Sequence, residues 1–505
     1  MANNKINVYY GSIALFSSIL HNVFLLYHVE LFVSVYKIDK TSFWIGEIIF
    51  LVWNSCNDPL FGWMSDKKYL KHSSSSQSNI VLARLKALSW NGPLFALSFL
   101  AFWVSWAFPS LQFVVCLCLY DSFLTMIDLH HSALLADLAV TTEQRTGLNF
   151  YSSFFGAFGS LSVFLSYIVW HRDQILRFQI FCCGLALISV VGFWFSTRQL
   201  RKIYLKYSKD EDAVSLAHRL QASSVDDSKD KASLRQFVSE LAGQQNFLWF
   251  AAMNLVQVFH CHFNSNFFPL FLENLLGDSI PQYLCSVLLG ISFIAPHLNN
   301  LYFLTLCRKW GTYYVIRGLF LVKLGLSLFM MAMGPTHVWL LALYIASNRV
   351  FTEGTCKLLS LVISDLVDED CVLHNRTQAV SALMFGTSSL LSKPGQTLAP
   401  LIGTWLLASQ TGESSFDPTV EADILLLSGH DVFDSGHSDG SIKLSLSSLD
   451  EPSRTMYRDG VFSLLVYIPT VCAVIQLCVW AQFSLHGKRL QWIKSLRSGS
   501  MYATV

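Results

Sequence analysis

The chain has 505 residues, of which 53% are hydrophobic and only 14% are charged, and its mean hydropathy is +0.43. Soluble domains carry about 25% charged residues, so a chain this long and this poor in charge cannot cover itself with polar surface. The formal net charge of +1 gives no general basis for binding nucleic acid. Composition therefore excludes a soluble globular protein and predicts an all-α integral membrane protein whose main partner is the lipid bilayer.

Apolar runs of about 20 residues, the length that a membrane-spanning helix needs, recur along the chain. We expect about 12 transmembrane helices, in two sets of six. In the first half, the predicted spans start near Val8, Ser42, Ala87, Gln112, Asn149 and Arg177. In the second half, they start near Asn246, Tyr283, Tyr313, Val338, Ala379 and Val461.

Lysine and arginine are concentrated in loops that share one side of the membrane if the spans alternate in direction. These basic groups follow predicted spans two, six, eight and twelve, at residues 67–86, 198–206, 308–309 and 488–497. Cytoplasmic loops carry such an excess, so this side is predicted to be cytoplasmic, together with both termini. The plasma membrane is the default location, and we expect a monomer.

The predicted spans divide the chain into two helical bundles and two polar segments. Residues 1–199 are expected to form an N-terminal six-helix bundle, and residues 244–505 a C-terminal one. The charged and serine-rich residues 200–243 are interpreted as a cytoplasmic linker between them. An acidic segment, 409–458, is predicted to be an extracytoplasmic loop within the second bundle.

Each half repeats the same short pattern at a helix end. A span ends in Asp-Leu, at Asp137 and again at Asp365, and a charged loop then leads to Arg-Thr, at Arg145 and Arg376. Two parallel repeats of six spans are the arrangement of major facilitator proteins, so the sequence predicts the major facilitator fold.

Three motifs carry a resemblance to a known family. The stretch WNSCNDPLFGWMSD, from Trp53, resembles the second-span signature of the glycoside–pentoside–hexuronide:cation symporters. SDLVDEDCVLHNRTQA, from Ser364, is similar to the family's loop between spans ten and eleven, and Lys393 matches its span-eleven lysine. The resemblance covers almost the whole chain and implies a transporter that couples carbohydrate transport to a cation.

The resemblance also implies a cation-coupling site. In that family, two aspartates one helical turn apart on span two bind the cation, and the matching positions here are Asn54 and Asp58. Asp128 matches a span-four aspartate, and Lys393 completes the predicted set. A pair of carboxylates suits Na⁺, whereas a single buried Asp suits a proton, so Asn54 favours H⁺ over Na⁺ as the coupling ion.

The positions that bind sugar in the resembling family differ here. A span-one aspartate falls on Ser18, a span-five arginine on Ser153, and two aromatic residues fall on Ser132 and Cys356. The platform on which a sugar ring stacks is thus largely absent, and a sugar-like solute is implied by the family alone.

Charged side chains inside a span are costly and are therefore candidates for function. Arg349, Glu353 and Lys357 are four residues apart on predicted span ten, so they share one helical face. Two interpretations stay open. The three residues either face the substrate cavity and bind an anionic group, or form an ion ladder that fixes helix packing.

Spans four and seven supply further candidates for the cavity. Asp121 lies on the same face of span four as Asp128, which suggests either a proton or cation route or hydrogen bonding between helices. His260 and Asn264 belong to a polar cluster on span seven, which is typical of a cavity lining. For either residue alone, a hydrogen bond between helices is the more frequent role. No metal site is predicted.

Several charges lie near the predicted cytoplasmic surface. Salt bridges between the two halves are one interpretation of them, and solvated loop charge is the default one. They are Asp66, Asp137, Asp365, Asp368, Glu369, Asp370 and Arg376.

The leading hypothesis is a secondary active transporter, a cation-coupled symporter of a small polar or anionic solute. No G-x-x-x-x-G-K-[ST] loop for ATP occurs, no catalytic constellation indicates an enzyme, and no cofactor is expected beyond a coupling ion. Two alternatives remain: a lysolipid transporter of the same fold, and a receptor or scaffold that does not transport.

Overall fold

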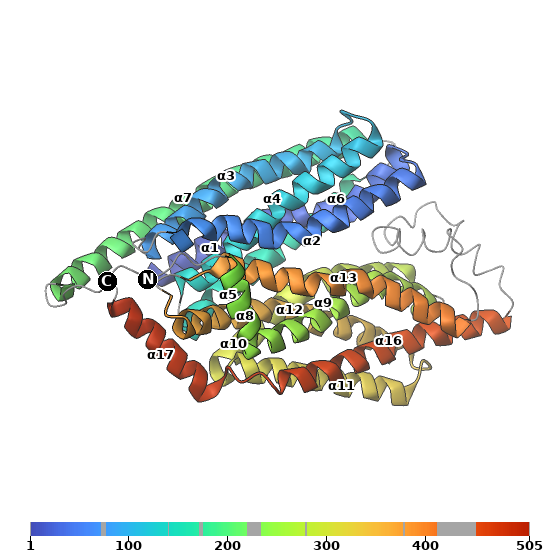
Figure 1. Ribbon diagram of the computed structural model, residues 1–505. Helices are drawn as coiled ribbons and strands as arrows, with labels where there is room; N and C mark the ends of the chain where they lie inside the picture. Colours follow the sequence, from blue (N-terminus) through green and yellow to red (C-terminus); the bar gives the residue numbers. More distant parts are fainter. Residues whose placement is uncertain are drawn as a thin grey trace.

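The computed structural model describes residues 2–71, 77–139, 141–170, 175–219, 234–277, 280–376, 379–411 and 451–503. Every regular element in these ranges is a helix, which confirms the all-α prediction. Figure 1 shows two bundles of long helices lying side by side, with both chain termini at the same end. We call this end of the molecule the terminal end.

The first bundle contains seven helices within the described residues. They are α1 (Ala2–Glu30), α2 (Lys40–Lys71), α3 (Gln77–Trp103), α4 (Pro109–Leu138), α5 (Thr142–Ser160), α6 (Ser162–Val169) and α7 (Ile175–Arg219). A π-helical turn, η1 (Leu31–Val35), extends α1.

The described residues of the second half form the second bundle and the short helices beside it. They are α8 (Leu234–Gly243), α9 (Gln245–Phe271), the π-helical turn η3 (Leu272–Leu276), α10 (Gln282–Trp310), α11 (Thr312–Met333), α12 (Val338–Leu373), α13 (Ser381–Thr411), α16 (Glu451–Trp480) and α17 (Gly487–Ala503). The short helices α8 and α17 lie near the terminal end (Figure 1).

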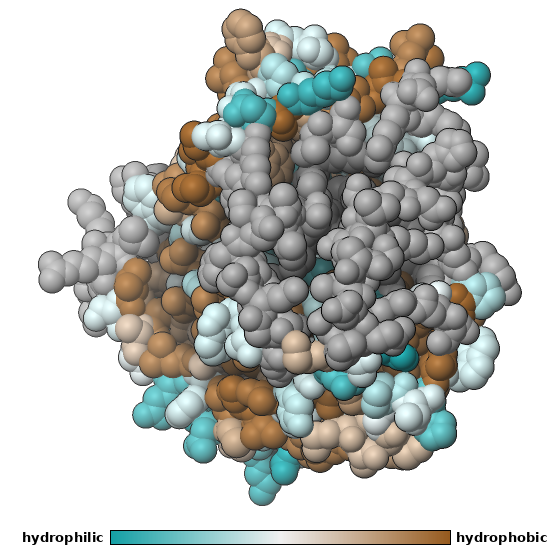
Figure 2. All heavy atoms as spheres, turned by 90° about the vertical axis from the view of Figure 1, so that its right-hand side faces the viewer, coloured by the Kyte–Doolittle hydropathy of each residue, from teal (hydrophilic) through white to brown (hydrophobic). Residues whose placement is uncertain are grey.

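Hydropathy and exposure both fit a bilayer as the surrounding solvent. Five described helices are long and apolar enough to cross a membrane by length and composition alone, within Asn4–His28, Pro109–Leu138, Ile175–Lys206, Thr312–Met333 and Thr455–Trp480. Other long helices carry buried charges, such as Asp58 in α2. Large apolar side chains are exposed on the outside of the bundles, and Figure 2 shows them around much of the described rim. Contact of such an apolar surface with lipid tails is favourable, whereas its exposure to water would be costly.

Glycines allow α2 and α13, which belong to different bundles, to cross closely. A Cβ added at Gly386 would lie 2.5 Å from the backbone oxygen of Asp58, and one at Gly62 would lie 2.7 Å from the backbone oxygen of Ala382. Only glycine fits such an approach of two backbones. The crossing brings the first turns of α13 against the backbone of Asp58.

The observed helix bounds refine the predicted organisation. Helix α7 continues through Arg219, into the segment interpreted as a linker, and α8 occupies its last part, whereas residues 220–233 lie outside the described residues. Most of the predicted acidic loop, 412–450, also lies outside them, and α16 begins at Glu451, ten residues before the predicted start at Val461. The predicted fifth span consists of two helices that meet at Leu161.

Candidate functional site: a cavity between the two bundles

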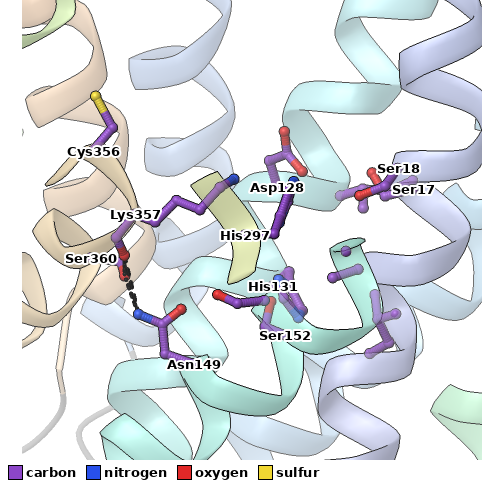
Figure 3. Close-up of a pocket in the computed structure, with 15 residues that line it drawn as sticks. Ser17, Ser18, Asp128, His131, Asn149, Ser152, His297, Cys356, Lys357 and Ser360 are labelled. Carbon is purple, nitrogen blue, oxygen red and sulfur yellow. Dashed lines mark hydrogen bonds between the residues drawn. The ribbon is translucent and has the colours of Figure 1, made fainter. Parts of the chain in front are cut away.

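A cavity of about 240 Å³ lies between the bundles, with α1, α4 and α5 on one side and α10 and α12 on the other. Its lining is mostly polar, and none of the described residues that line it is Phe, Tyr or Trp. Figure 3 shows this lining, which consists of Ile13, Ala14, Ser17, Ser18, Ile127, Asp128, His131, Asn149, Ser152, Ser153, Gly156, His297, Cys356, Lys357 and Ser360.

Two opposite charges face this cavity from different bundles. Asp128 comes from α4 and is exposed to the cavity although it lies in the middle of its helix. The side chain of Lys357 extends from α12 toward the side that holds Asp128 and His297 (Figure 3). Within the described part of the chain, no salt bridge joins Asp128 and Lys357. Both charges are therefore available to a solute that enters the cavity.

Polar contacts between the bundles hold the cavity walls in place. Asn149 Nδ2 donates to the backbone oxygen of Lys357 at 3.1 Å and to Ser360 Oγ at 3.4 Å (Figure 3). Asn300 of α10 donates to Ser153 of α5. These bonds fix α12 and α10 against α5, so the position of Lys357 relative to the first bundle is set by hydrogen bonds at its own backbone.

A second charged cluster, which we call the Lys393 cluster, lies where α2, α4 and α13 meet. Lys393 Nζ is 3.0 Å from Asp58 Oδ2 and donates to Asn54 Oδ1 at 2.6 Å and to Asn57 Oδ1 at 3.2 Å. It also contacts the backbone oxygen of Asn54. Asn57 in turn donates to Asp121. An ammonium group thus occupies a nest of carboxylate, amide and carbonyl oxygens, which are the ligands of a hard cation.

The structure separates the predicted coupling residues into two places. Asn54, Asp58 and Lys393 meet in the Lys393 cluster, whereas Asp128 lies in the cavity. Asp121, predicted to line the substrate cavity, belongs instead to the Lys393 cluster, because α2 crosses α4 at its level. Asn57, which links Asp121 to Lys393, was not predicted, although it lies beside Asp58 in the quoted motif.

Four other predicted cavity residues are engaged inside the second bundle and do not line the cavity. His260 Nδ1 lies 3.4 Å from Lys323 Nζ, and Asn264 Nδ2 donates to Thr352 Oγ1 at 3.2 Å. The guanidinium of Arg349 lies 4.8 Å from the ring centre of Phe268, and Glu353 accepts a hydrogen bond from Ser265 at 3.4 Å. Of the three charged residues Arg349, Glu353 and Lys357, only Lys357 lines the cavity.

Sequence reasoning also missed Lys323, which is buried in the second bundle with 2% of its surface exposed. Its Nζ lies 3.2 Å from Gln476 Oε1 and 3.5 Å from Gln257 Oε1, and Gln476 donates to Gln257 at 2.6 Å. A lysine in the middle of an apolar span is itself a signal of a buried polar network, so the residue could have been found.

An ionic network closes the terminal end of the first bundle. Arg84 of α3 is 1% exposed and contacts Asp66 of α2 at 3.0 Å and Asp137 of α4 at 2.5 Å. Asp66 and Asp137 also reach α13 of the second bundle, where they accept hydrogen bonds from the backbone of Leu383 at 2.8 Å and from Ser381 Oγ at 2.6 Å. These carboxylates are buried and paired, so the default interpretation of solvated loop charge is wrong for them.

Other salt bridges join the two bundles directly at the same end. Arg145 of α5 contacts Asp365 at 2.9 Å and Asp368 at 2.8 Å, both in α12. Lys494 of α17 contacts Asp365 at 2.9 Å and donates to Thr142 of the first bundle at 2.6 Å. Salt bridges between the halves, the alternative interpretation of these charges, are therefore present.

The remaining charges of this loop region pair within the second bundle and its flanking helices. Arg376 contacts Asp370 and Glu240, each at 2.6 Å. Glu369 accepts hydrogen bonds from Asn246 and Arg489, each at 2.7 Å. Every acidic residue predicted near this surface thus has a partner in the structure.

Known proteins place these features in a family. The family model described as MFS/sugar transport protein matches residues 9–426. The chain belongs to this family. It therefore has the major facilitator fold, and it is a multi-pass membrane protein of a transporter family. Among the described residues, no group of three or more His, Cys, Asp and Glu side chains could hold a metal ion.

Curated relatives and solved structures agree with this assignment. The chain is 57% identical over 501 residues to transmembrane protein 180 of Gallus gallus, covering 98% of this chain and 95% of the relative. It is 53% identical over 506 residues to the protein of the same name in Mus musculus, covering 97% and 95%.

Two solved structures show the same fold at low sequence identity. A bacterial homologue of the iron transporter ferroportin, in an outward-facing state, aligns with a TM-score of 0.61 at 12% identity and covers 96% of this chain and 100% of its own. The E. coli fucose:proton symporter FucP aligns with a TM-score of 0.55 at 11% identity, covering 95% and 98%.

Proposed function

We propose that this protein is a cation-coupled symporter that carries a small polar or anionic solute through the cavity between its bundles. The observation that supports it most is the pair of opposite charges, Asp128 and Lys357, that face a polar cavity from different bundles. In a major facilitator protein, a site between the halves is the one that alternating access exposes to each side in turn. A solute held by both bundles couples their movement.

The Lys393 cluster supports coupling to a cation. The ammonium group of Lys393 in α13 contacts oxygens of Asn54 and Asp58 in α2, so it lies at the position that we propose for a bound cation. In our proposal, a cation arriving at Asp58 displaces Lys393 and loosens the contact between α2 and α13. A proton fits this role better than Na⁺, because Asn54 leaves the position with one carboxylate fewer than a Na⁺ site of two carboxylates provides.

The size and lining of the cavity bear on the solute. A volume of about 240 Å³ is below the usual range for drug-sized ligands and suits a small molecule rather than a lysolipid with a long acyl chain. A sugar-like solute, which the family suggests, lacks an aromatic stacking surface among the described lining residues. The polar and charged lining favours a solute that carries charge of its own.

The orientation of the protein is part of the proposal. The terminal end carries Arg308, Arg489, Lys494 and Arg497, and loops rich in Lys and Arg are retained in the cytoplasm. We place this end, with both termini, on the cytoplasmic side, and take the plasma membrane as the location. The ionic network around Arg84 and Arg145 then closes the cytoplasmic side.

Uptake by proteoliposomes tests the proposal. Purified full-length protein is reconstituted and screened against labelled sugars, amino acids, organic anions and lysolipids, with an imposed pH or Na⁺ gradient. We expect uptake driven by a pH gradient, and its loss in Asp58→Asn. Glu143→Gln, an exposed carboxylate at the start of α5, is the matched control and should transport normally.

The same screen separates the alternatives. Uptake of a lysolipid alone would contradict a small-solute cavity. Absence of uptake across the panel, with folded protein and a working reference transporter in parallel, would favour a receptor or scaffold instead.

A further inference from the structure

The cavity holds one negative and one positive side chain that no salt bridge among the described residues pairs. Asp128 is exposed to the cavity, and Lys357 extends toward it from the opposite wall (Figure 3). All acidic side chains of the terminal-end network, by contrast, are matched by Arg, Lys or amide groups. Opposite charges placed across a cavity without a salt bridge between them are complementary to a ligand that carries both charges at its two ends.

We propose that the solute of this cavity is a small zwitterion, with an ammonium group that binds Asp128 and a carboxylate or other anionic group that binds Lys357. This inference rests on the proposed function, since it names the solute class of the same cavity. Binding of the zwitterion neutralises both cavity charges at once, which neither an anion, a cation nor a neutral sugar can do.

The rest of the lining fits such a solute. Ser17 and Ser18 of α1, with Ser152 of α5, offer hydroxyl groups around the charged pair. His131 is held by a hydrogen bond of 3.1 Å between its Nε2 and the backbone oxygen of Tyr10, so it forms a fixed polar wall. Small hydroxyl-bearing side chains leave room for a short aliphatic segment between the two charged ends. No described lining residue supplies a second carboxylate or a second Lys or Arg to compete with the pair.

Direct binding tests the inference without requiring transport. Purified full-length protein in detergent is titrated calorimetrically, and by thermal shift, with three compounds of equal chain length: γ-aminobutyrate, n-butylamine and butyrate. We expect γ-aminobutyrate, or another member of the ω-amino acid series from glycine to 5-aminopentanoate, to bind at least about 30-fold more tightly than the matching amine and acid. The chain length of the member that binds most tightly then indicates the distance between the two charges.

Two substitutions assign each end of the ligand. Lys357→Gln should remove the preference for the zwitterion over the amine, and Asp128→Asn should remove the preference over the acid. Lys309→Gln and Glu143→Gln, which change the same residue types at exposed positions, should leave all affinities unchanged. The exchanged pair, Asp128→Lys with Lys357→Asp, keeps one charge on each wall and should recover zwitterion binding relative to the single variants.

The outcomes distinguish this inference from the proposed function. Equal affinities within every matched trio, or no binding of any zwitterion in the series, would overturn the inference even if the proteoliposomes take up another solute. Discrimination in favour of the zwitterion, lost in the two single variants, would support it even if no gradient drives uptake. The wild-type comparison needs no variant, so a failure of Asp128→Asn or Lys357→Gln to fold leaves the test intact.

Discussion

The terminal end and the central cavity both place charged side chains inside an apolar bundle, but they treat them differently. At the terminal end, Arg84 satisfies Asp66 and Asp137, and Arg145 satisfies Asp365 and Asp368. In the cavity, Asp128 and Lys357 face the same space without a salt bridge between them. Buried charges that contact an opposite charge hold helices together, whereas charges that face a cavity without a salt bridge are available to a ligand or an ion. In our proposal, this contrast distinguishes a contact that holds the two bundles together from a cavity that binds the solute.

The largest effect is expected from removing Arg84. Arg84→Met leaves two carboxylates buried without their cation, and breaking such a network costs about 3–5 kcal/mol. We expect a strong fall in the thermal stability of the purified protein, measured as the fraction that stays monodisperse after heating in detergent. Arg201→Gln, at an exposed position of α7, is the control and should behave as wild type. Unchanged stability of Arg84→Met would mean that the network does not hold the bundle together.

Removing Arg145 should act on the relation between the bundles. Arg145→Gln breaks the salt bridges from α5 to Asp365 and Asp368, at a cost of about 2–5 kcal/mol to the closed terminal end. Cys371, which is buried beside this network, should then react faster with a thiol reagent, as measured by site-resolved mass spectrometry. If labelling of Cys371 keeps its wild-type rate, the salt bridges do not determine whether this end is closed.

A smaller effect is expected at Lys393, whose salt bridge with Asp58 is less buried than those of Arg84 at the terminal end. The side chains of Lys393 and Asp58 are 16% and 11% exposed, so loss of the pair in Lys393→Gln should cost about 1–2 kcal/mol. The oxygens of Asn54 and Asp58, which Lys393 contacts in the wild type, are then open to a small hard cation. The thermal stability of the variant should therefore rise with added Na⁺, even though the proposed coupling ion of the intact protein is a proton. Lys309→Gln should show no such response, and its absence in Lys393→Gln would refute the cation nest.

The smallest effect is expected at Arg489. Its side chain is 48% exposed, and it contacts Glu369 at 2.7 Å from the outer side of the network. Exposed pairs contribute about 0.2–1 kcal/mol, so the effect of Arg489→Gln on thermal stability should be at most about a third of the Arg84→Met effect. An equally large fall in both variants would show that depth in the bundle does not decide the strength of these contacts.

Sequence reasoning reached the fold because the fold depends on regularities along the chain. Apolar runs of spanning length, basic loops and the Asp-Leu and Arg-Thr repeat all occur within local segments. The motif from Trp53 predicted Asn54 and Asp58, and Lys393 was predicted with them, and the structure brings these three together. These three could be grouped because a family motif carries information about contacts that the residues alone do not; the fourth member of the predicted set, Asp128, lies apart in the cavity.

The same reasoning did not reach the partners of the other charges. Asp121 and Asp128 lie two helical turns apart on one face of α4, so helical periodicity cannot predict that they have different surroundings. The structure assigns Asp121 to the Lys393 cluster and Asp128 to the cavity. Likewise, His260 lies in a polar span, yet its partner is Lys323, which is 63 residues away in the chain.

The sequence by itself thus determined that the protein is an all-α membrane protein, which segments form its long helices, and which side chains are too costly to be buried without a role. Only the tertiary structure decided which of these charges are paired and which face a cavity. The physical reason is that a helical pattern fixes the face on which a side chain lies but not what that face meets. A salt bridge or a cavity between distant helices depends on where those helices cross, and close-packed crossings such as that of Gly386 with Asp58 are set by the packing of the whole bundle.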